Sequence, residues 1–136
     1  SPHYAAELDG IGIDHAALTP PALPCVIETA GGHMVPLTRR DLQIDLLARW
    51  QLPVVLVAAT MLGTINHTLL SIEALRRRDI PLIGIAYVGS ANDDSEHTIC
   101  ELSGARRLGR LPLLQDLTAT TLRAAFEANF SREDFP

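Results

Sequence analysis

Residues 51–67 read QLPVVLVAATMLGTINH, and this stretch decides the fold. Its apolar run at 54–58 has no polar alternation, which is typical of a strand covered on both faces in a parallel sheet. Gly63 then permits a tight turn, and Thr64 is a good N-cap for a helix that ends near Arg78. The order of strand, glycine turn and helix is the unit from which α/β domains are built.

The same order recurs along the chain. Further strands are expected at 24–28, 81–88 and 107–112, and further helices at 41–50, from 94 or 95 to 104, and at 118–129. Residues 1–23 are expected to be irregular. The alternation predicts a three-layer α/β fold: a mainly parallel sheet with helices on both faces, right-handed crossovers and a ligand site at the carboxyl ends of the strands.

Length and composition restrict the class of protein. The 136 residues suit one domain spanning 1–136, and 47% hydrophobic with 20% charged residues suits a packed core. A net charge of −5 argues against nucleic-acid binding, and no apolar run reaches the roughly 18 residues that span a membrane. Cys25 and Cys100 lie far apart in sequence, so neither a disulfide framework nor a metal site is indicated. We expect a cytoplasmic protein.

A carboxylate followed by small residues closes the first expected strand. Glu28 precedes Thr29, and then Ala30, Gly31 and Gly32 allow a ligand to approach the backbone. A carboxylate oxygen is a suitable Mg²⁺ ligand, and the N–H groups of such a loop can face phosphate oxygens. The alternative is a solvent-facing glutamate before an ordinary glycine turn.

A second candidate site follows the strand at 54–58. Asn66 falls in the first helical turn after Gly63, beside free backbone donors that bind carboxylates or phosphates. Asn66 can instead cap the helix locally, and His67 can be a partly buried helix residue.

Together these segments resemble the dethiobiotin synthetases. The family's Glu-Gly-Ala-Gly-Gly loop before an apolar run and Val-Pro-Leu is similar to residues 28–37, and its Leu-Pro-Val-Val-Leu-Val strand to residues 52–57. Its Leu-Gly-x-Ile-Asn-His segment is similar to residues 62–67, its Glu-Ala-Leu helix segment to 73–75, and its Gly-x-Leu/Ile-Pro segment to 109–112. Order and spacing agree over essentially the whole chain.

The resemblance implies an ATP- and Mg²⁺-dependent ring closure. One amine of 7,8-diaminononanoate takes up CO₂ as a carbamate, ATP phosphorylates it to a carbamic-phosphoric anhydride, and the second amine closes the cyclic urea of dethiobiotin. It also implies a homodimer with the substrate near the subunit interface, and the following roles: Glu28 as catalytic Mg²⁺ ligand; Glu28, Thr29, Ala30, Gly31, Val88, Gly89, Pro112, Leu113 and Leu114 at the nucleotide; Leu62, Gly63 and Asn66 at the substrate's carboxylate end.

The sequence departs from the family pattern at three points. Thr29 replaces the commonest glycine, which is tolerable only where φ is not positive. Val88 stands where many members carry an asparagine at the adenine edge. The phosphate loop Gly-x-x-x-x-Gly-Lys-[Ser/Thr] does not occur in the 136 residues, nor do the family's carbamate lysine and second acidic metal ligand. We therefore expect this chain to be the carboxy-terminal part of the enzyme and inactive alone.

Two other interpretations remain at this point. The first is a non-catalytic dimerisation or ligand-binding remnant of the same fold. The second is another P-loop relative, such as a cobyrinate-type amidating enzyme or a division-site ATPase, although these lack the combined loop and Leu-Gly-x-Ile-Asn-His pattern.

Overall fold

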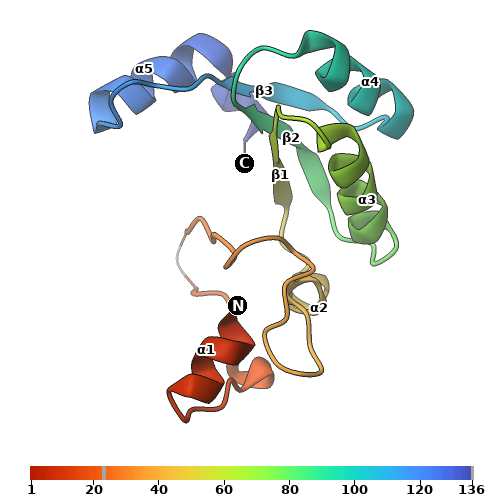
Figure 1. Ribbon diagram of the computed structural model, residues 1–136, viewed down its shortest axis with the longest axis vertical. Helices are drawn as coiled ribbons and strands as arrows, with labels where there is room; N and C mark the ends of the chain where they lie inside the picture. Colours follow the sequence, from red (N-terminus) through yellow and green to blue (C-terminus); the bar gives the residue numbers. More distant parts are fainter. Residues whose placement is uncertain (23, 136) are drawn as a thin grey trace. The chain divides into compact units, whose positions relative to one another are not determined.

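A computed structural model describes residues 1–22 and 24–135 (Figure 1). The chain forms two compact units, and each is described by itself. The first comprises Ser1–Leu52 and Arg78–Ile80, and the second comprises Pro53–Arg77 and Pro81–Pro136. None of the helices in the described part of the chain is long and apolar enough to cross a membrane.

The second unit is a parallel sheet with crossover helices. Strands β1 (Val54–Ala59), β2 (Leu82–Val88) and β3 (Arg107–Leu111) lie in the order β1-β2-β3, with both pairs parallel. Parallel neighbours need a long connection, and helices α3 (Thr64–Arg76) and α4 (Asp93–Ser103) provide the two connections. Helix α5 (Ala119–Asn129) and a short 3-10 helix, η2 (Arg132–Asp134), follow β3. The expected α/β class is confirmed.

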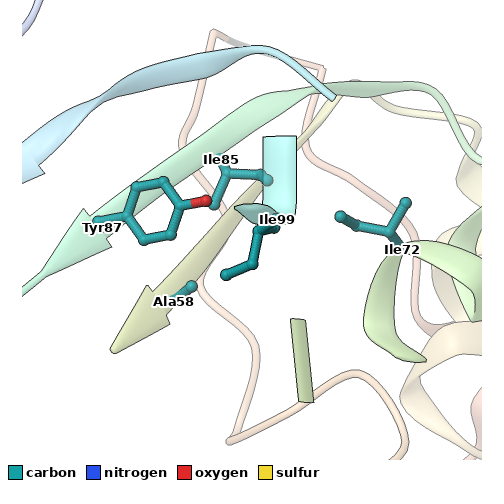
Figure 2. Close-up of a cluster of buried hydrophobic side chains, with 5 residues drawn as sticks. All are labelled: Ala58, Ile72, Ile85, Tyr87 and Ile99. Atoms are coloured by element: carbon teal, nitrogen blue, oxygen red, sulfur yellow. The ribbon is translucent and has the colours of Figure 1, made fainter. Parts of the chain in front are cut away.

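An apolar core joins one face of this sheet to α3 and α4. Figure 2 shows its five buried members, Ala58 from β1, Ile85 and Tyr87 from β2, Ile72 from α3 and Ile99 from α4. Ile85 and Tyr87 are two residues apart, so both side chains point to the same face of the sheet. Fully burying one such aliphatic side chain contributes about 1.5–3 kcal/mol, which makes this cluster the main stabilising element of the unit.

The expected helices of this unit are present, with shifted starts. Thr64 was expected to cap α3, but the N-cap is Gly63, whose φ of +93° favours glycine. Helix α4 begins at Asp93 because the Asn92 side chain accepts a hydrogen bond from the Ser95 N–H. Gly104, with φ +63°, ends this helix as expected.

Strand β1 is less covered than its apolar sequence predicted. Ala58 is buried in the core, whereas Val57, on the other face of the strand, is 64% exposed. Because side chains alternate across a strand, an uninterrupted apolar run shows that both faces suit burial without showing what covers them. The described residues of the second unit leave Val57 largely exposed.

The first unit is built from short helices and ordered loops. It contains α1 (Pro2–Leu8), a 3-10 helix, η1 (His15–Ala17), and α2 (Gln43–Trp50). Residues 1–23 were expected to be irregular, so α1 and η1 correct that prediction; Leu23 lies outside the described residues. Pro2 suits a first helical turn because its missing N–H is not needed there, and the Asp14 carboxylate caps η1.

The strand expected at 24–28 is wrong in this structure. These residues have no regular secondary structure, and the Val26 side chain is 99% exposed. A strand exists only when its N–H and C=O groups pair with a neighbour, and residues 24–28 form no ladder with the described residues. Cys25, expected within a buried run, is likewise exposed.

Candidate functional site

The small-residue loop after Glu28 is held against the start of α2 by hydrogen bonds. The Gln43 side chain, only 4% exposed, accepts from the Ala30 N–H at 2.9 Å. Its amide nitrogen donates to the carbonyls of Ala30 at 3.1 Å and Gly32 at 3.0 Å. The backbone N–H groups of Gln43 and Ile44 donate to the carbonyls of Val35 at 2.9 Å and His33 at 2.7 Å. Side-chain and main-chain hydrogen bonds therefore hold residues 30–35 against the first turn of α2.

These bonds divide the N–H groups of the loop into two sets. The Ala30 N–H is bound to Gln43, and the Gly31 N–H donates to the Thr29 carbonyl at 2.9 Å. The Thr29 and Gly32 N–H groups have no hydrogen-bond partner among the described residues. Of the loop N–H groups expected to face an anion, those of Thr29 and Gly32 are therefore the ones without a partner among the described residues.

Thr29 fits its position despite replacing the family's commonest glycine. Positive φ values at non-glycine residues are confined, in the described chain, to Gln51 and Asp79, while Gly31 has φ +90°. The Thr29 hydroxyl donates to the Gly31 carbonyl at 2.7 Å. The loop therefore needs glycine at 31, and threonine at 29 adds a hydrogen bond across the turn.

Glu28 is exposed, and its carboxylate forms no ion pair or hydrogen bond with the described residues. No cluster of three or more His, Cys, Asp or Glu side chains occurs in the part of the chain that the structure describes. This donor set fits Mg²⁺ only in the manner of phosphate-transfer sites, in which one or two carboxylates bind the ion together with substrate phosphates and water.

The carboxyl ends of the three strands meet at one edge of the second unit. The Thr60 N–H donates to the Val88 carbonyl at 3.1 Å, and the Gly89 N–H donates to the Leu111 carbonyl at 3.0 Å. The Asn92 side chain donates to the Thr60 carbonyl at 3.3 Å. This is the edge at which ligands bind in open parallel sheets.

Gly89 is required at this edge because the neighbouring loop approaches it closely. A Cβ atom on Gly89 would lie 2.3 Å from the Thr60 hydroxyl oxygen, and the φ of Gly89 is +134°. The loops after β1 and β2 are therefore in contact here.

A family model described as an AAA domain matches residues 1–121. The ATP-dependent dethiobiotin synthetase BioD of Sphingopyxis alaskensis is 56% identical over 99% of this chain and 67% of its own length. Those of Rhodopseudomonas palustris strain TIE-1 and Afipia carboxidovorans are 61% and 59% identical over 99% of this chain and 65% and 66% of their own lengths.

The chain belongs to the dethiobiotin synthetase family. It spans about two thirds of the length of these curated relatives. The family resemblance drawn from the loop and strand motifs is confirmed.

The family's expected substrate residues lie in the second unit, directly after β1. Leu62 is fully exposed, and Asn66 is exposed in the first turn of α3. His67 is also exposed, which differs from the partly buried position considered from the sequence. Asn66 forms no side-chain hydrogen bond with the described residues, so its amide is available to a ligand.

The expected adenine-side residues also lie at the carboxyl edge. Val88 ends β2, and residues 112–114 follow β3. Leu113 is 75% exposed, whereas Pro112 and Leu114 are half-buried. The second unit thus brings the expected adenine and carboxylate residues to one edge, while Glu28, Thr29, Ala30 and Gly31 belong to the first unit.

The sequence interpretation missed Gln43. A helix was expected at 41–50; the structure forms it as α2, Gln43–Trp50, and buries Gln43 together with Ile44 and Leu46. A polar residue on the buried side of an amphipathic helix requires hydrogen-bond partners. The sequence therefore indicated that Gln43 needs hydrogen-bond partners, but it did not indicate that Ala30 and Gly32 are those partners.

His33 is the perturbed titratable group beside this loop. Burial, followed by the nearby Arg78 charge, lowers the pKa of the His33 imidazole below its ordinary value of 6.5. Its Nε2 atom is buried without a hydrogen-bond partner among the described residues. Burial therefore favours the neutral form of the His33 imidazole, and the His33 backbone carbonyl accepts a hydrogen bond from the Ile44 N–H at the start of α2.

Proposed function

We propose that this chain forms part of an enzyme that converts 7,8-diaminononanoate and CO₂ to dethiobiotin with ATP and Mg²⁺. The observation that carries the proposal is 56–61% identity to proteins named ATP-dependent dethiobiotin synthetase over 99% of the chain. The Gln43-supported loop and the strand edge supply groups that suit the reaction.

The reaction needs positioning and charge stabilisation. An amine nitrogen of the substrate attacks CO₂ and loses a proton, giving a carbamate. A carbamate oxygen then attacks the γ-phosphorus of ATP and ADP leaves, forming the carbamic-phosphoric anhydride. The second amine attacks the carbamoyl carbon, loses a proton and expels phosphate as the cyclic urea closes. No protein nucleophile is required, so the enzyme acts mainly by orientation and electrostatics.

In this proposal Glu28 is the chain's Mg²⁺ ligand, and Thr29 to Gly31 lie against the nucleotide and carbamate. When bound, Mg²⁺ neutralises charge on the transferring phosphoryl group. The exposed Glu28 carboxylate and the N–H groups of Thr29 and Gly32 without partners support this assignment. Of the expected contacts, Ala30 and Gly31 contribute through their small size, because their N–H groups are already bonded.

The second unit is proposed to contact the remaining parts of the two substrates. Val88, Gly89 and the segment at 112–114 form the adenine side, and Leu62, Gly63 and Asn66 bind the substrate's carboxylate end. In a homodimer, the latter residues serve the site of the neighbouring subunit. The exposed Met61 and Leu62 side chains, at 72% and 105%, support such an interface because large apolar side chains gain from cover.

The direct test is Glu28→Ala in the complete gene product that contains this sequence. Loss of one charged metal ligand should reduce Mg-ATP-dependent dethiobiotin formation by at least about 10–100-fold, the loss already typical of residues that only orient a metal ligand, with an unchanged circular dichroism spectrum. Asp9→Ala, at another exposed carboxylate of the first unit, should retain full turnover. Unchanged turnover in Glu28→Ala would remove Glu28 from the metal site.

The family's adenine-edge asparagine is replaced here by Val88, which motivates a second test. Main-chain groups are then expected to read the base, so discrimination between ATP and other nucleoside triphosphates should be weak. Initial rates with ATP, GTP and CTP measure it, and Val88→Asn should increase the preference for ATP. A strict ATP preference in the unsubstituted enzyme would contradict this expectation.

A further inference from the structure

We infer that Gln43 is a positioning residue of the proposed nucleotide site. By binding part of the loop at 29–32, Gln43 determines which backbone N–H groups of that loop stay available to phosphate oxygens. The inference rests on the proposed function. Its structural basis is the contact between the buried Gln43 amide and both the N–H and the carbonyl of Ala30.

The hydrogen bonds that the Gln43 side chain makes with the described residues all go to the loop. Its oxygen accepts one hydrogen bond from the Ala30 N–H, and its nitrogen donates two, to the carbonyls of Ala30 and Gly32. The orientation of the amide follows from its partners, because an N–H needs an acceptor and carbonyls need donors. Gln43 is 4% exposed, so its amide is shielded from water while it makes these bonds.

This arrangement fixes the direction of the backbone. With its N–H and carbonyl both bound to Gln43, the Ala30 peptide groups are turned toward α2. The neighbouring Thr29 and Gly32 N–H groups have no partner among the described residues, and they are left for a ligand. Gly31, at φ +90°, makes the reversal between them. Without Gln43, the Ala30 N–H and two carbonyls would need other partners, and the loop would have several alternative conformations.

The start of α2 is itself not an anion site. Its first backbone N–H groups already have partners. The backbone N–H of Gln43 donates to the Val35 carbonyl, that of Ile44 to the His33 carbonyl, and that of Leu42 to the Asp45 carboxylate at 2.9 Å. Helix α2 therefore acts on the ligand through the loop, with Gln43 as the side-chain link. This is the reason to call Gln43 a positioning residue and not a catalytic one.

The test compares Gln43→Leu with Asp45→Ala in the complete gene product. Leucine fills a similar volume without hydrogen bonds, whereas Asp45→Ala removes a cap from the same helical turn without touching residues 29–32. We expect Gln43→Leu to raise the KM for Mg-ATP about tenfold, the cost of misplacing a loop that makes one or two charge-assisted hydrogen bonds. The KM for 7,8-diaminononanoate should stay within about twofold. Asp45→Ala should leave both KM values within about twofold.

Amide hydrogen exchange supplies an independent measurement. The Ala30 N–H should exchange faster in Gln43→Leu than in the unsubstituted protein, and at its original rate in Asp45→Ala. If Gln43→Leu does not fold, Gln43→Glu decides the question, since it keeps the acceptor for Ala30 but loses both donated bonds. A threefold or greater rise in its KM for Mg-ATP, about 0.65 kcal/mol, supports the role, and an unchanged KM overturns it.

The outcomes separate the two proposals. Equal KM values for Gln43→Leu and Asp45→Ala, with normal turnover in the unsubstituted enzyme, overturn the positioning role alone. Absence of Mg-ATP-dependent turnover in the unsubstituted complete gene product overturns the proposed function and, with it, the role of Gln43.

Discussion

The two units of this chain are stabilised in different ways. In the second, side chains from strands and helices bury one another in a continuous apolar cluster (Figure 2). The first unit also buries apolar side chains, among them Ile44, Leu46 and Ile80, but its loops are held in addition by polar side-chain contacts. Gln43 binds the loop at 30–32, Arg39 binds Glu7 at 2.7 and 2.6 Å, and Arg49 binds the carbonyl of His15 at 2.8 Å. The loops of the first unit therefore depend on individual side-chain hydrogen bonds, whereas the core of the second unit depends on apolar burial.

The largest expected effect is loss of core volume in the second unit. Ile85 in β2 is fully buried, so Ile85→Ala removes apolar contacts and leaves a cavity. We expect this substitution to lower the free energy of unfolding by about 3 kcal/mol. Val57→Ala, on the exposed face of β1, should cost less than about 1 kcal/mol. Urea unfolding followed by circular dichroism measures both. Similar losses at the two positions would contradict a core that covers only the Ala58 face of β1.

Gly89→Ala tests the close approach at the strand edge. The added Cβ would meet the Thr60 hydroxyl at 2.3 Å, and alanine would be strained at φ +134°, so we expect a loss of about 2 kcal/mol. Combining it with Thr60→Ala removes the clash and leaves the backbone strain. The double variant should therefore recover part of the loss in a double-mutant cycle, and additive losses would rule out the clash.

Glu96 sharpens the comparison because it is a polar group inside the apolar unit. Its buried carboxylate accepts a hydrogen bond from Arg107 at 2.8 Å, and it lies 2.9 Å from the Arg110 Nε, which is misaligned for a hydrogen bond and acts as an ion pair. Arg107 is 45% exposed, so solvent replaces part of what is lost. Glu96→Gln should cost about 1–2 kcal/mol, and Glu101→Gln, at an exposed pair with His97, less than about 0.5 kcal/mol. Thermal unfolding at neutral pH measures both, and equal shifts would contradict a special role for burial.

The smallest expected effect is a pH dependence of the first unit. Because the pKa of His33 is lowered in the folded protein, the unfolded chain binds more protons just below pH 6.5, and stability falls as the pH decreases through that range. The hydrogen bond from Arg39 lowers the pKa of the Glu7 carboxyl, so the stability that this pair contributes is lost only as the pH falls below 4.5. Hydrogen exchange of α2 amides at several pH values separates the two windows.

His33→Gln is the control for the upper window. Glutamine does not titrate, so the loss of stability that begins just below pH 6.5 should disappear, while the loss that begins below pH 4.5 should remain. Persistence of the upper window in this variant would assign it to another group.

The regular elements of the second unit were predictable from local patterns. The apolar run at 54–58 predicted β1, and the Gly63 turn followed by Thr64 predicted the helix α3 after it. Gly104 predicted the end of α4 because only glycine adopts φ +63° without cost. The expected strand at 24–28 failed because strand formation depends on a partner that no local pattern contains.

The candidate site followed a similar division. Residue type and spacing alone predicted that small residues follow Glu28 and that Leu62, Gly63 and Asn66 follow a strand. In contrast, the binding of the loop by Gln43 from α2 and the close approach of Gly89 to Thr60 became visible only in the folded chain. Such contacts join residues distant in sequence, and their hydrogen bonds and close approaches exist only once the chain has brought them together.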